Sequence, residues 1–322
     1  MMARAGSRST FKEGRDDLKI YAGIEVSAKD IERVSEGMGQ QMELWASQER
    51  KEIMGDSQLL RSEKTIPILY ISYDGTGVPM IQEGLTGRKG KQADGSAKTR
   101  EAKLGCVFTQ TTTNVQGLPV RDPDATSFVG AIESAEDFGW RIYGEALRRG
   151  LSKAQRVVVL ADGARWIKNL VQMHFPEATF IIDLYHARQH VSELCKILFV
   201  GNEKKIVQQR MRWWTDLDDG KVEKIIHQAQ PYLPEDPDTK KRVEIEIHYL
   251  EKNAESMRYA EFRAQGLFVG SGVVEAGCKT LIGQRLKQSG MEWSVRGANA
   301  IISLRCILTS GRFEDYRESR AV

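Results

Sequence analysis

The chain has 322 residues, of which 41% are hydrophobic and 28% are charged, as in globular proteins of one large domain or two ordinary ones. Its 47 Lys and Arg residues exceed its 44 Asp and Glu residues by only 3, so net charge alone does not indicate a nucleic-acid partner. No apolar run approaches the ~18 residues that cross a membrane. The N-terminus lacks the apolar core of a signal peptide, and the four cysteines form no CxxC pair, which argues against secretion and a structural zinc site.

The start of the chain predicts a helical segment over residues 1–60. Residues 1–17 are polar and charged, and we expect them to be disordered. Ser27 and Asp30 have the spacing of a capping box, in which Ser27 caps a helix and Asp30 reaches back to it. This helix fits either an ordinary helical pair or the second half of a helix-turn-helix, so the segment could hold a partial helix-turn-helix.

Five segments read as strands separated by turns and helices. Three strands come first, then a helix over 127–150, a fourth strand, a helix over 165–175, and a fifth strand that runs into another helix. The strands are predicted at 65–80, 103–112, 117–122, 156–164 and from 178 to Asp183. This order predicts an α/β fold of the ribonuclease-H-like class, a mixed five-stranded sheet flanked by helices.

The remaining segments complete the expected domain organisation. Residues 61–195 would form the first part of the core, and residues 266–322 its C-terminal part with the last catalytic helix. The highly charged stretch 196–265 has helical patterning with a break at PYLPEDPDTKK, which predicts an all-α insertion before that helix.

Two aspartates terminate predicted strands. Asp74 terminates the buried run of the first strand and Asp162 that of the fourth; these strands are neighbours in a ribonuclease-H-like sheet, so the two carboxylates should converge at one edge. Two close carboxylates repel each other unless a proton or a cation lies between them. Mg²⁺ suits such a position because it prefers oxygen ligands and leaves room for phosphates.

Glu275 is the best candidate for a third carboxylate. A helix around it would place Glu275, Lys279, Ile282 and Leu286 near one face. Two metal ions about 3.5–4 Å apart can then activate an attacking oxygen and stabilise a leaving one in phosphoryl transfer. Each acid alone is more simply a turn, a cap or a solvated residue, but three acids in this topological order favour a metal site.

Asp183 and His186 lie at the junction of the fifth strand and the next helix. Side chains at this spacing can hydrogen-bond and orient a neighbouring group. His186 and His190 are also one helical turn apart, which would suit a metal pair, but an orienting or structural role for Asp183 and His186 is favoured.

Two basic clusters predict contacts to DNA phosphates. The glycine-rich loop after the first strand contributes Arg88, Lys89, Lys91, Lys98, Arg100 and Lys103. The segment around Glu275 contributes Lys279, Gln284, Arg285 and Lys287. Trp213 and Trp214 follow another basic run and could stack on a base, although tryptophans at such positions are more often part of a core.

Several of these motifs together resemble a known family. They are DGTGVPM, GRKGKQADGSAKTREAKLGCVFTQT, VVVLADGARWI, DLYHARQHV and GSGVVEAGCKTLIGQRLKQSGMEWS. Over about residues 18–315 the chain resembles bacterial insertion-sequence transposases of the Kra group, which are DDE transposases with a ribonuclease-H-like core. The resemblance implies that Asp74, Asp162 and Glu275 form a catalytic triad that binds Mg²⁺, with Mn²⁺ as a substitute. It also implies that Asp183 and His186 match the D-x-x-H motif shared with Mutator-like transposases.

The resemblance further implies a function and partners. Such an enzyme hydrolyses a phosphodiester at the ends of its element and transfers the freed strand to target DNA. It would bind double-stranded DNA as a homodimer or larger assembly, in the cytoplasm at the bacterial nucleoid. Relatives are typically longer and begin with a cysteine-containing segment and a full helix-turn-helix, so the chain is expected to be shortened at its N-terminus.

Three other functions fit part of the pattern. A catalytically impaired DNA-binding remnant or repressor would bind DNA without cutting it. A ribonuclease-H-like nuclease would cut without strand transfer. A metal-dependent phosphatase would explain the carboxylates but neither the basic loop nor the helical insertion.

Overall fold

The computed structural model describes residues 1–55, 65–90, 92 and 95–320, which form two compact units. The first unit consists of Met1–Thr109, Pro123–Gln155 and Gly272–Val322. The second consists of Gln110–Asp122 and Arg156–Ser271. Among the described residues, no helix has both the length and the apolar character that crossing a bilayer requires.

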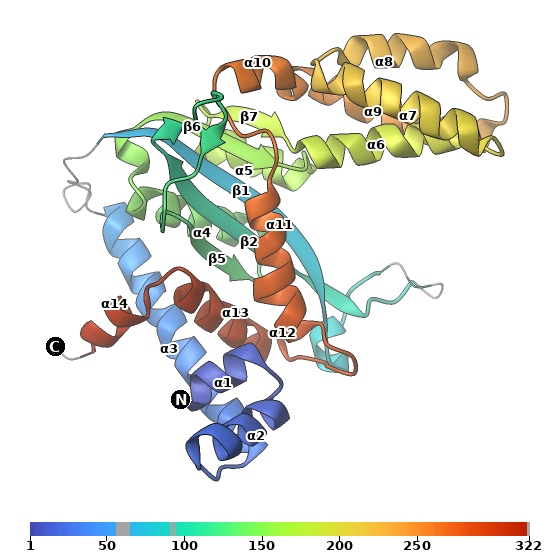
Figure 1. Cartoon of the computed structure of the whole chain (residues 1–322). Coiled ribbons are helices and arrows are strands. Elements are labelled where there is room, and N and C mark those ends of the chain that lie inside the picture. The colour runs from blue at the N-terminus through green and yellow to red at the C-terminus, as the bar shows by residue number, and fades with distance from the viewer. Residues whose placement is uncertain (56–64, 91, 93–94, 321–322) are drawn as a thin grey trace. The chain divides into compact units, whose positions relative to one another are not determined.

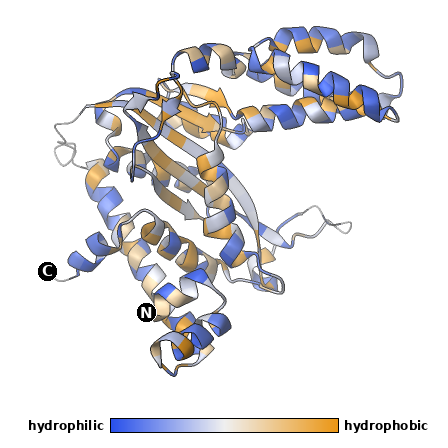
Figure 2. Cartoon of the chain, viewed as in Figure 1, coloured by the Kyte–Doolittle hydropathy of each residue, from blue (hydrophilic) through white to orange (hydrophobic). Residues whose placement is uncertain are grey.

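A five-stranded sheet carries the fold, in the order β5-β2-β1-β6-β7 (Figure 1). Its strands are β1 (Ile66–Pro79), β2 (Thr99–Gln110), β5 (Ser127–Ala131), β6 (Ala154–Ala161) and β7 (Thr179–Ile182). β2 pairs antiparallel with β5, and β6 pairs parallel with β7. The central stretches of these strands are hydrophobic, as Figure 2 shows. Three strands of a meander followed by alternating strands and helices give the ribonuclease-H-like order, so the predicted fold class is confirmed.

The third strand of this sheet differs from the prediction. It is β5, which the sequence predicts as the start of a helix, whereas segment 117–122 contributes only β4 (Pro119–Val120) to a small pair with β3 (Thr112–Thr113). The helix α4 (Ala135–Arg148) begins later, where the Ser134 hydroxyl accepts the backbone N–H of Asp137 at 3.0 Å. A five-residue apolar run directly before a helix has no periodicity that separates strand from helix.

Three helices form the start of the first unit: α1 (Met2–Arg8), α2 (Phe11–Ala22) and α3 (Ala28–Gly55). The prediction that residues 1–17 are disordered is wrong, because α2 has its own capping box and α1 is held by contacts from distant residues. Thr10 and Glu13 exchange the two bonds of that box, both at 3.0 Å. The capping box predicted for Ser27 and Asp30 is confirmed, with bonds of 3.2 and 3.1 Å at the start of α3.

The crossing of α3 with α13 (Val295–Thr309) is close because Gly39 has no side chain. A Cβ atom at Gly39 would lie 2.0 Å from the carbonyl oxygen of Ala300. Around this crossing, the apolar side chains of Met42 and Leu304 are completely buried. The crossing is completed by α14 (Phe313–Glu318), whose Tyr316 joins the same cluster.

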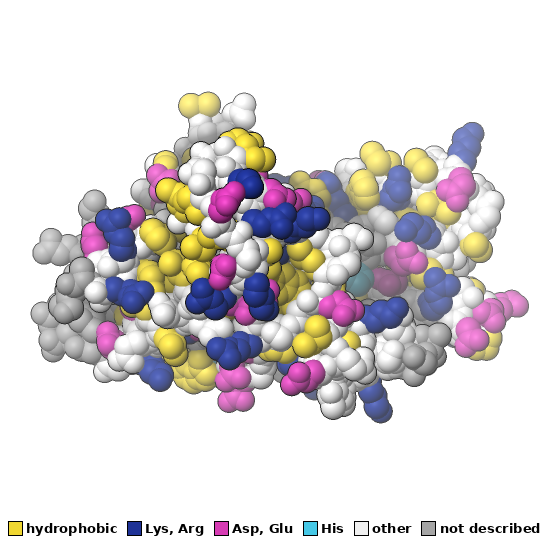
Figure 3. All heavy atoms as spheres, turned by 90° about the horizontal axis from the view of Figure 1, so that it is seen from below, with side chains coloured by type: hydrophobic (Ala, Val, Ile, Leu, Met, Phe, Trp, Pro, Cys, Tyr) yellow, Lys and Arg dark blue, Asp and Glu magenta, His cyan; other side chains and the backbone are white. Residues whose placement is uncertain are grey.

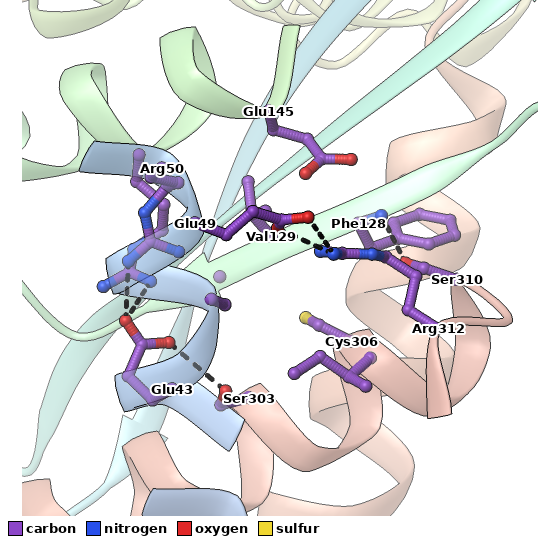
Figure 4. Close-up of a pocket in the computed structure, with 14 residues that line it drawn as sticks. Glu43, Glu49, Arg50, Phe128, Val129, Glu145, Ser303, Cys306, Ser310 and Arg312 are labelled. Atoms are coloured by element: carbon purple, nitrogen blue, oxygen red, sulfur yellow. Dashed lines mark hydrogen bonds and ion pairs between the residues drawn. The ribbon is translucent and has the colours of Figure 1, made fainter. Parts of the chain in front are cut away.

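A network of partly buried ion pairs lies beside this crossing (Figure 4). Glu43 accepts hydrogen bonds from Arg50 at 2.8 Å and Arg141 at 2.6 Å, and Glu49 pairs with Arg312 at 2.7 Å. The side chains surround a cavity of only about 30 Å³, so the charged groups pack on one another.

The arginines in this network keep its carboxylates charged. Burial alone would raise the pKa of Glu43, but the charges of Arg141 and Arg50 and the hydrogen bonds to them hold it below the ordinary value. Burial also opposes ionisation of Glu145, and its Arg148 partner at 2.5 Å again brings the pKa below the ordinary value. The first unit therefore depends on ionised glutamates at neutral pH.

The second unit combines β6 and β7 with helices. These are α5 (Arg165–His174), α6 (Leu184–Leu198), α7 (Glu203–Asp218), α8 (Val222–Ala229), α9 (Pro237–Asn253) and α10 (Tyr259–Ala264). The predicted helical character of 196–265 agrees with these bounds, but the predicted break over 231–241 is shorter than expected, because α9 begins within it at Pro237. Trp213 is completely buried and donates a 2.9 Å hydrogen bond to Gln228, so it is a core residue. Trp214 is partly buried and donates to the carbonyl of Arg188 at 3.1 Å.

Candidate active site

Asp74 lies within β1 rather than at its end. The strand predicted over 65–80 is confirmed as β1, which continues past Asp74 to Pro79, and its fully buried run ends at Tyr73, directly before Asp74. Added Cβ atoms at Gly75 and Gly77 would lie within 3 Å of the Glu101 and Thr99 side chains, so these glycines make room for β2. The Asp74 carboxylate is half-buried, and its Oδ1 accepts the N–H of Gly75 at 2.7 Å.

Asp74 and Glu275 line the same cavity in the first unit. The cavity has a volume of about 520 Å³ and lies between β1 and the helical segment that begins with α11 (Gly272–Gly277). This helical segment lies against β1 (Figure 1). Two of the three predicted acids, distant in sequence, are thus brought to one place, together with the amine-bearing side chains of Lys279 and Lys287.

The helix that carries Glu275 changes its winding directly after it. A π-helical stretch covers Cys278–Gly283 and α12 (Gln284–Leu286) follows. Glu275 and Lys279 line the cavity, whereas Ile282 and Leu286 are completely buried, so the prediction that all four share one face is wrong. The i→i+5 pattern of a π-helix shifts the phase of the residues that follow, and π-helical turns are frequent at functional sites.

Gly277 sets how closely this helix approaches the sheet. A Cβ atom there would lie 2.7 Å from the ring of Phe128 in β5 and 2.9 Å from the side chain of Leu104 in β2. A larger residue would push the helix, and with it Glu275, away from the strands.

Cys278 is a member of the site that the sequence does not single out. Its thiol is buried, lines the cavity and hydrogen-bonds to Asp74. Burial and the neighbouring Asp74 carboxylate raise the pKa of this thiol, which therefore stays protonated and acts as a donor. Lys287 Nζ also donates to Thr76 Oγ1 of β1 at 2.9 Å. Only the position of the helix on β1 reveals these pairs, because the partners are far apart in the chain.

Asp162 belongs to the second unit and directly follows β6. Its Oδ1 accepts the N–H of Ala164 at 2.8 Å across the turn at Gly163, which has a φ of 79°. Its backbone carbonyl accepts the hydroxyl of Tyr249 at 2.8 Å. The predicted triad is therefore divided between the units. Within the parts of the chain that the structure describes, no three His, Cys, Asp or Glu side chains are grouped closely enough to hold a metal ion.

Asp183 is buried at the start of α6 and binds backbone rather than an imidazole. It accepts the N–H of His186 at 2.7 Å and also the N–H of Ser271. The expected bond between the Asp183 and His186 side chains is thus replaced by a helix cap that also fixes the segment after α10. The ring of His190 pairs with Glu246 at 2.6 Å and stacks on Tyr249 with a centroid distance of 3.6 Å.

Comparison with known proteins places this chain in a family. The model of the uncharacterised protein family UPF0236 matches residues 117–321, which is more than half of the chain. The chain belongs to this family. The UPF0236 protein in the vanSb 3′ region of Streptococcus gallolyticus is 22% identical over 316 residues, which cover 95% of this chain and 62% of that protein. The chain thus spans less than two thirds of the length of this relative.

A solved structure is also similar, although weakly. It is titled Drosophila P element transposase strand transfer complex, with 11% identity, a TM-score of 0.25, and coverage of 79% of this chain and 66% of that chain. A likeness at this level carries no functional inference, and the fold class of the UPF0236 chain follows from its own strand order.

The predicted DNA-binding residues of this UPF0236 protein differ in their exposure. Some are exposed on the first unit, namely Arg88, Lys89, Lys98, Lys279, Gln284 and Lys287. Arg100 is half-buried, and Lys91 lies outside the described residues. Lys103 is buried, pairs with Glu101 at 3.2 Å and donates to the carbonyl of Glu133 at 2.9 Å, so its predicted role at DNA gives way to a structural one.

Arg285 is also structural, contrary to the prediction. It is completely buried, donates to the carbonyl of Gly6 at 2.8 Å, and lies over the rings of Phe11 and Trp293 at 4.5 and 4.9 Å. Burial and the nearby charge of Arg305 lower the pKa of Arg285 to about 10. Within this UPF0236 protein, Arg285 joins the N-terminal helices to the helix that carries Glu275.

Proposed function

We propose that this protein is a DNA transposase of a bacterial insertion sequence, of the Kra group. The observation that carries the proposal is the shared cavity of Asp74 and Glu275, with Lys279 and Lys287 on its walls. Carboxylates beside amines suit a phosphodiester, because the carboxylates can hold cations while the amines contact phosphate oxygens. The ribonuclease-H-like strand order supports the same class of enzyme.

In this proposal Asp162 is the third acid of the catalytic triad, as the resemblance to the transposase family implies. β6, which Asp162 follows, is the neighbour of β1 in the strand order of the sheet. The carboxylate oxygens of Asp74, Asp162 and Glu275 fit the ligand preference of Mg²⁺, or of Mn²⁺ in its place. When bound, the metal would supply activation of the attacking oxygen and stabilisation of the leaving one.

The protein's own groups would prepare this chemistry. The N–H of Gly75 and the thiol of Cys278 orient the Asp74 carboxylate. Lys279 and Lys287 would hold the oxygens of the phosphate that is cut. In the first step a water oxygen attacks phosphorus and the bond to the 3′ oxygen breaks, which leaves a 3′-hydroxyl and a 5′-phosphate. In the second step that hydroxyl loses its proton and attacks a phosphorus of target DNA; the new P–O bond forms as the bond to the target strand's 3′ oxygen breaks, and that oxygen takes up a proton and leaves as a 3′-hydroxyl.

The test is cleavage of labelled duplex DNA that carries the inverted repeats flanking the gene. We expect nicking at the repeat in Mg²⁺ or Mn²⁺, and its loss in Asp162→Ala. Asp238→Ala is the matched control, because Asp238 is an exposed aspartate at the start of α9. Nicking that survives Asp162→Ala unchanged would overturn the assignment.

The same assay separates the alternatives. Cleavage without joined products on a plasmid target would indicate a nuclease that does not transfer strands. Tight binding of DNA without metal-dependent cleavage would indicate a DNA-binding remnant or repressor. In the transposase, two DNA ends must be paired, so we also propose that the protein acts as a dimer or larger assembly on DNA.

A further inference from the structure

A second, larger hollow in the first unit adjoins the carboxylate cavity. It has a volume of about 1250 Å³ and is bounded by the end of β1, the start of β2 and the segment after α12. Lys287 lines both hollows, so they meet at its side chain. We call the larger hollow the hairpin groove, because the chain between β1 and β2 forms much of its wall.

The walls of the hairpin groove are held together by backbone hydrogen bonds. The N–H of Ile81 donates to the carbonyl of Trp293 at 3.0 Å, and the N–H of Trp293 donates to the carbonyl of Pro79 at 3.1 Å. Trp293 also donates from its indole to the carbonyl of Leu286 at 3.1 Å. The segment after α12 is thus fastened to the end of β1, which gives the groove a fixed side next to Lys287.

The cations in this groove have few acidic neighbours. Arg88, Lys98 and Lys287 are exposed and line it, and none of them forms an ion pair with a carboxylate among the described residues. Glu292 is the acidic residue among the described lining side chains. On the face in Figure 3, Lys and Arg side chains are interspersed with Asp and Glu.

A nearby arginine adds to this crowding of positive charge. Burial and the charge of Arg88 lower the pKa of Arg100, so the two guanidinium groups repel each other. An anion placed between such groups relieves the repulsion. Gly87, with a φ of 72°, leaves the backbone beside Arg88 open to close approach. These features suit a chain of phosphates rather than a single small anion.

We infer that the hairpin groove binds the phosphodiester backbone of the DNA strand next to the phosphate that is cut. The inference rests on the proposed function and adds to it the path that the strand follows. Lys287 holds the phosphate at the junction with the carboxylate cavity, and Lys98 and Arg88 hold phosphates further along. The groove reads no base sequence, because its cations contact backbone oxygens.

The first test measures binding without any cleavage. Fluorescence anisotropy of duplex DNA in EDTA gives the slope of log affinity against log salt, which is about 0.9 per neutralised phosphate. For Arg88→Gln, Lys98→Gln and Lys287→Gln combined, we expect this slope to be shallower by about 0.9 for each phosphate that is no longer neutralised. The control combines Lys153→Gln, Lys240→Gln and Lys241→Gln, which removes the same charge from exposed positions elsewhere. Equal slopes for the two triple variants would overturn the inference.

The second test locates the strand. The four native cysteines are buried, so a cysteine introduced at an exposed position can be labelled selectively with a photo-crosslinker. We expect a label at Ser289→Cys, in the groove, to crosslink DNA within a few nucleotides of the cut site. A label at Ser152→Cys, exposed on the first unit outside the groove, is the control. Crosslinks from Ser289→Cys that are absent, or spread evenly along the DNA, would contradict the proposed path.

These results are separable from the test of the proposed function. If Asp162→Ala leaves nicking unchanged while the groove variants weaken binding, the groove binds DNA but the transposase assignment fails. If Asp162→Ala abolishes nicking while the groove variants bind as the control does, the enzyme assignment stands and the strand follows another path.

Discussion

The crossing of α3 and α13 predicts opposite effects for two glycines of one helix. A methyl group at Gly39 would lie 2.0 Å from the carbonyl oxygen of Ala300, and because contacts below 3.0 Å are not tolerated, α13 must move by about 1 Å. Gly37, two residues earlier, has no neighbour within 4 Å of such a methyl group. Gly37→Ala is therefore the matched control for Gly39→Ala.

The expected magnitudes follow from packing and helix propensity. Overpacking costs about 1–3 kcal/mol, and the upper end applies at Gly39 because the atom in the way is backbone. Alanine recovers about 1 kcal/mol of helix propensity at either position. Gly39→Ala should therefore destabilise by about 2 kcal/mol, and Gly37→Ala should stabilise by up to about 1 kcal/mol.

Thermal unfolding followed by circular dichroism at 222 nm measures the difference. For a domain of this size about 2–4 °C corresponds to 1 kcal/mol, so Gly39→Ala should lower Tm by about 4–8 °C and Gly37→Ala should raise it slightly. Equal shifts in the same direction for both variants would refute the close contact at Gly39.

Three further predictions concern the site and the buried charges. Glu275→Gln should reduce metal-dependent nicking by at least about 100-fold. The control Glu235→Gln, at an exposed position, should leave nicking unchanged. A Glu275→Gln variant that still nicks DNA would exclude Glu275 as a metal ligand. Gly277→Ala should displace the helix that carries Glu275, so nicking should fall strongly while Tm falls only slightly. Unchanged nicking would show that the helix tolerates the added methyl group. Glu43 and Glu145 have lower pKa values in the folded protein than the ordinary glutamate value of about 4.3. Their ionised forms therefore stabilise the fold at pH values above about 4.3, and this stabilisation is lost as the pH falls through the pKa values of the folded state. Glu43→Gln should therefore flatten the decrease of Tm below about pH 4.5, and a decrease as steep as that of the unmodified protein would contradict this.

The sequence predicts the sheet better than the site, for physical reasons. Strands and helices have periodicities that are visible in short windows, so β1, β2, β6, β7 and the later helices are all expected from it. Taken alone, Asp74-Gly75 reads most simply as a turn, because Asp-Gly is common in turns. Here Gly75 and Gly77 instead accommodate side chains of β2, and only the pairing of the strands reveals that use.

Residue type alone also misplaces the charged side chains. Arg285 and Lys103 have the same chemistry as exposed cations and lie in basic stretches, but one is covered by Phe11 and Trp293 and the other by β-sheet neighbours. Such burial depends on segments far away in the chain. Cys278 does not stand out for the same reason, because nothing near it in the chain indicates that Asp74 lies beside it.

The contact between Arg285 and the first helices has a practical consequence for anyone who expresses the protein. The carbonyls of Gly6 and Ser7 accept bonds from Arg285 and Arg305, and Arg305 also binds the carbonyl of Leu281 at 2.8 Å. Removing the first ten residues would remove the backbone carbonyls that accept hydrogen bonds from Arg285 and Arg305. We expect this loss to destabilise the π-helical stretch that follows Glu275. A tag is therefore better attached at the other terminus, because the first residues support the helix that carries Glu275.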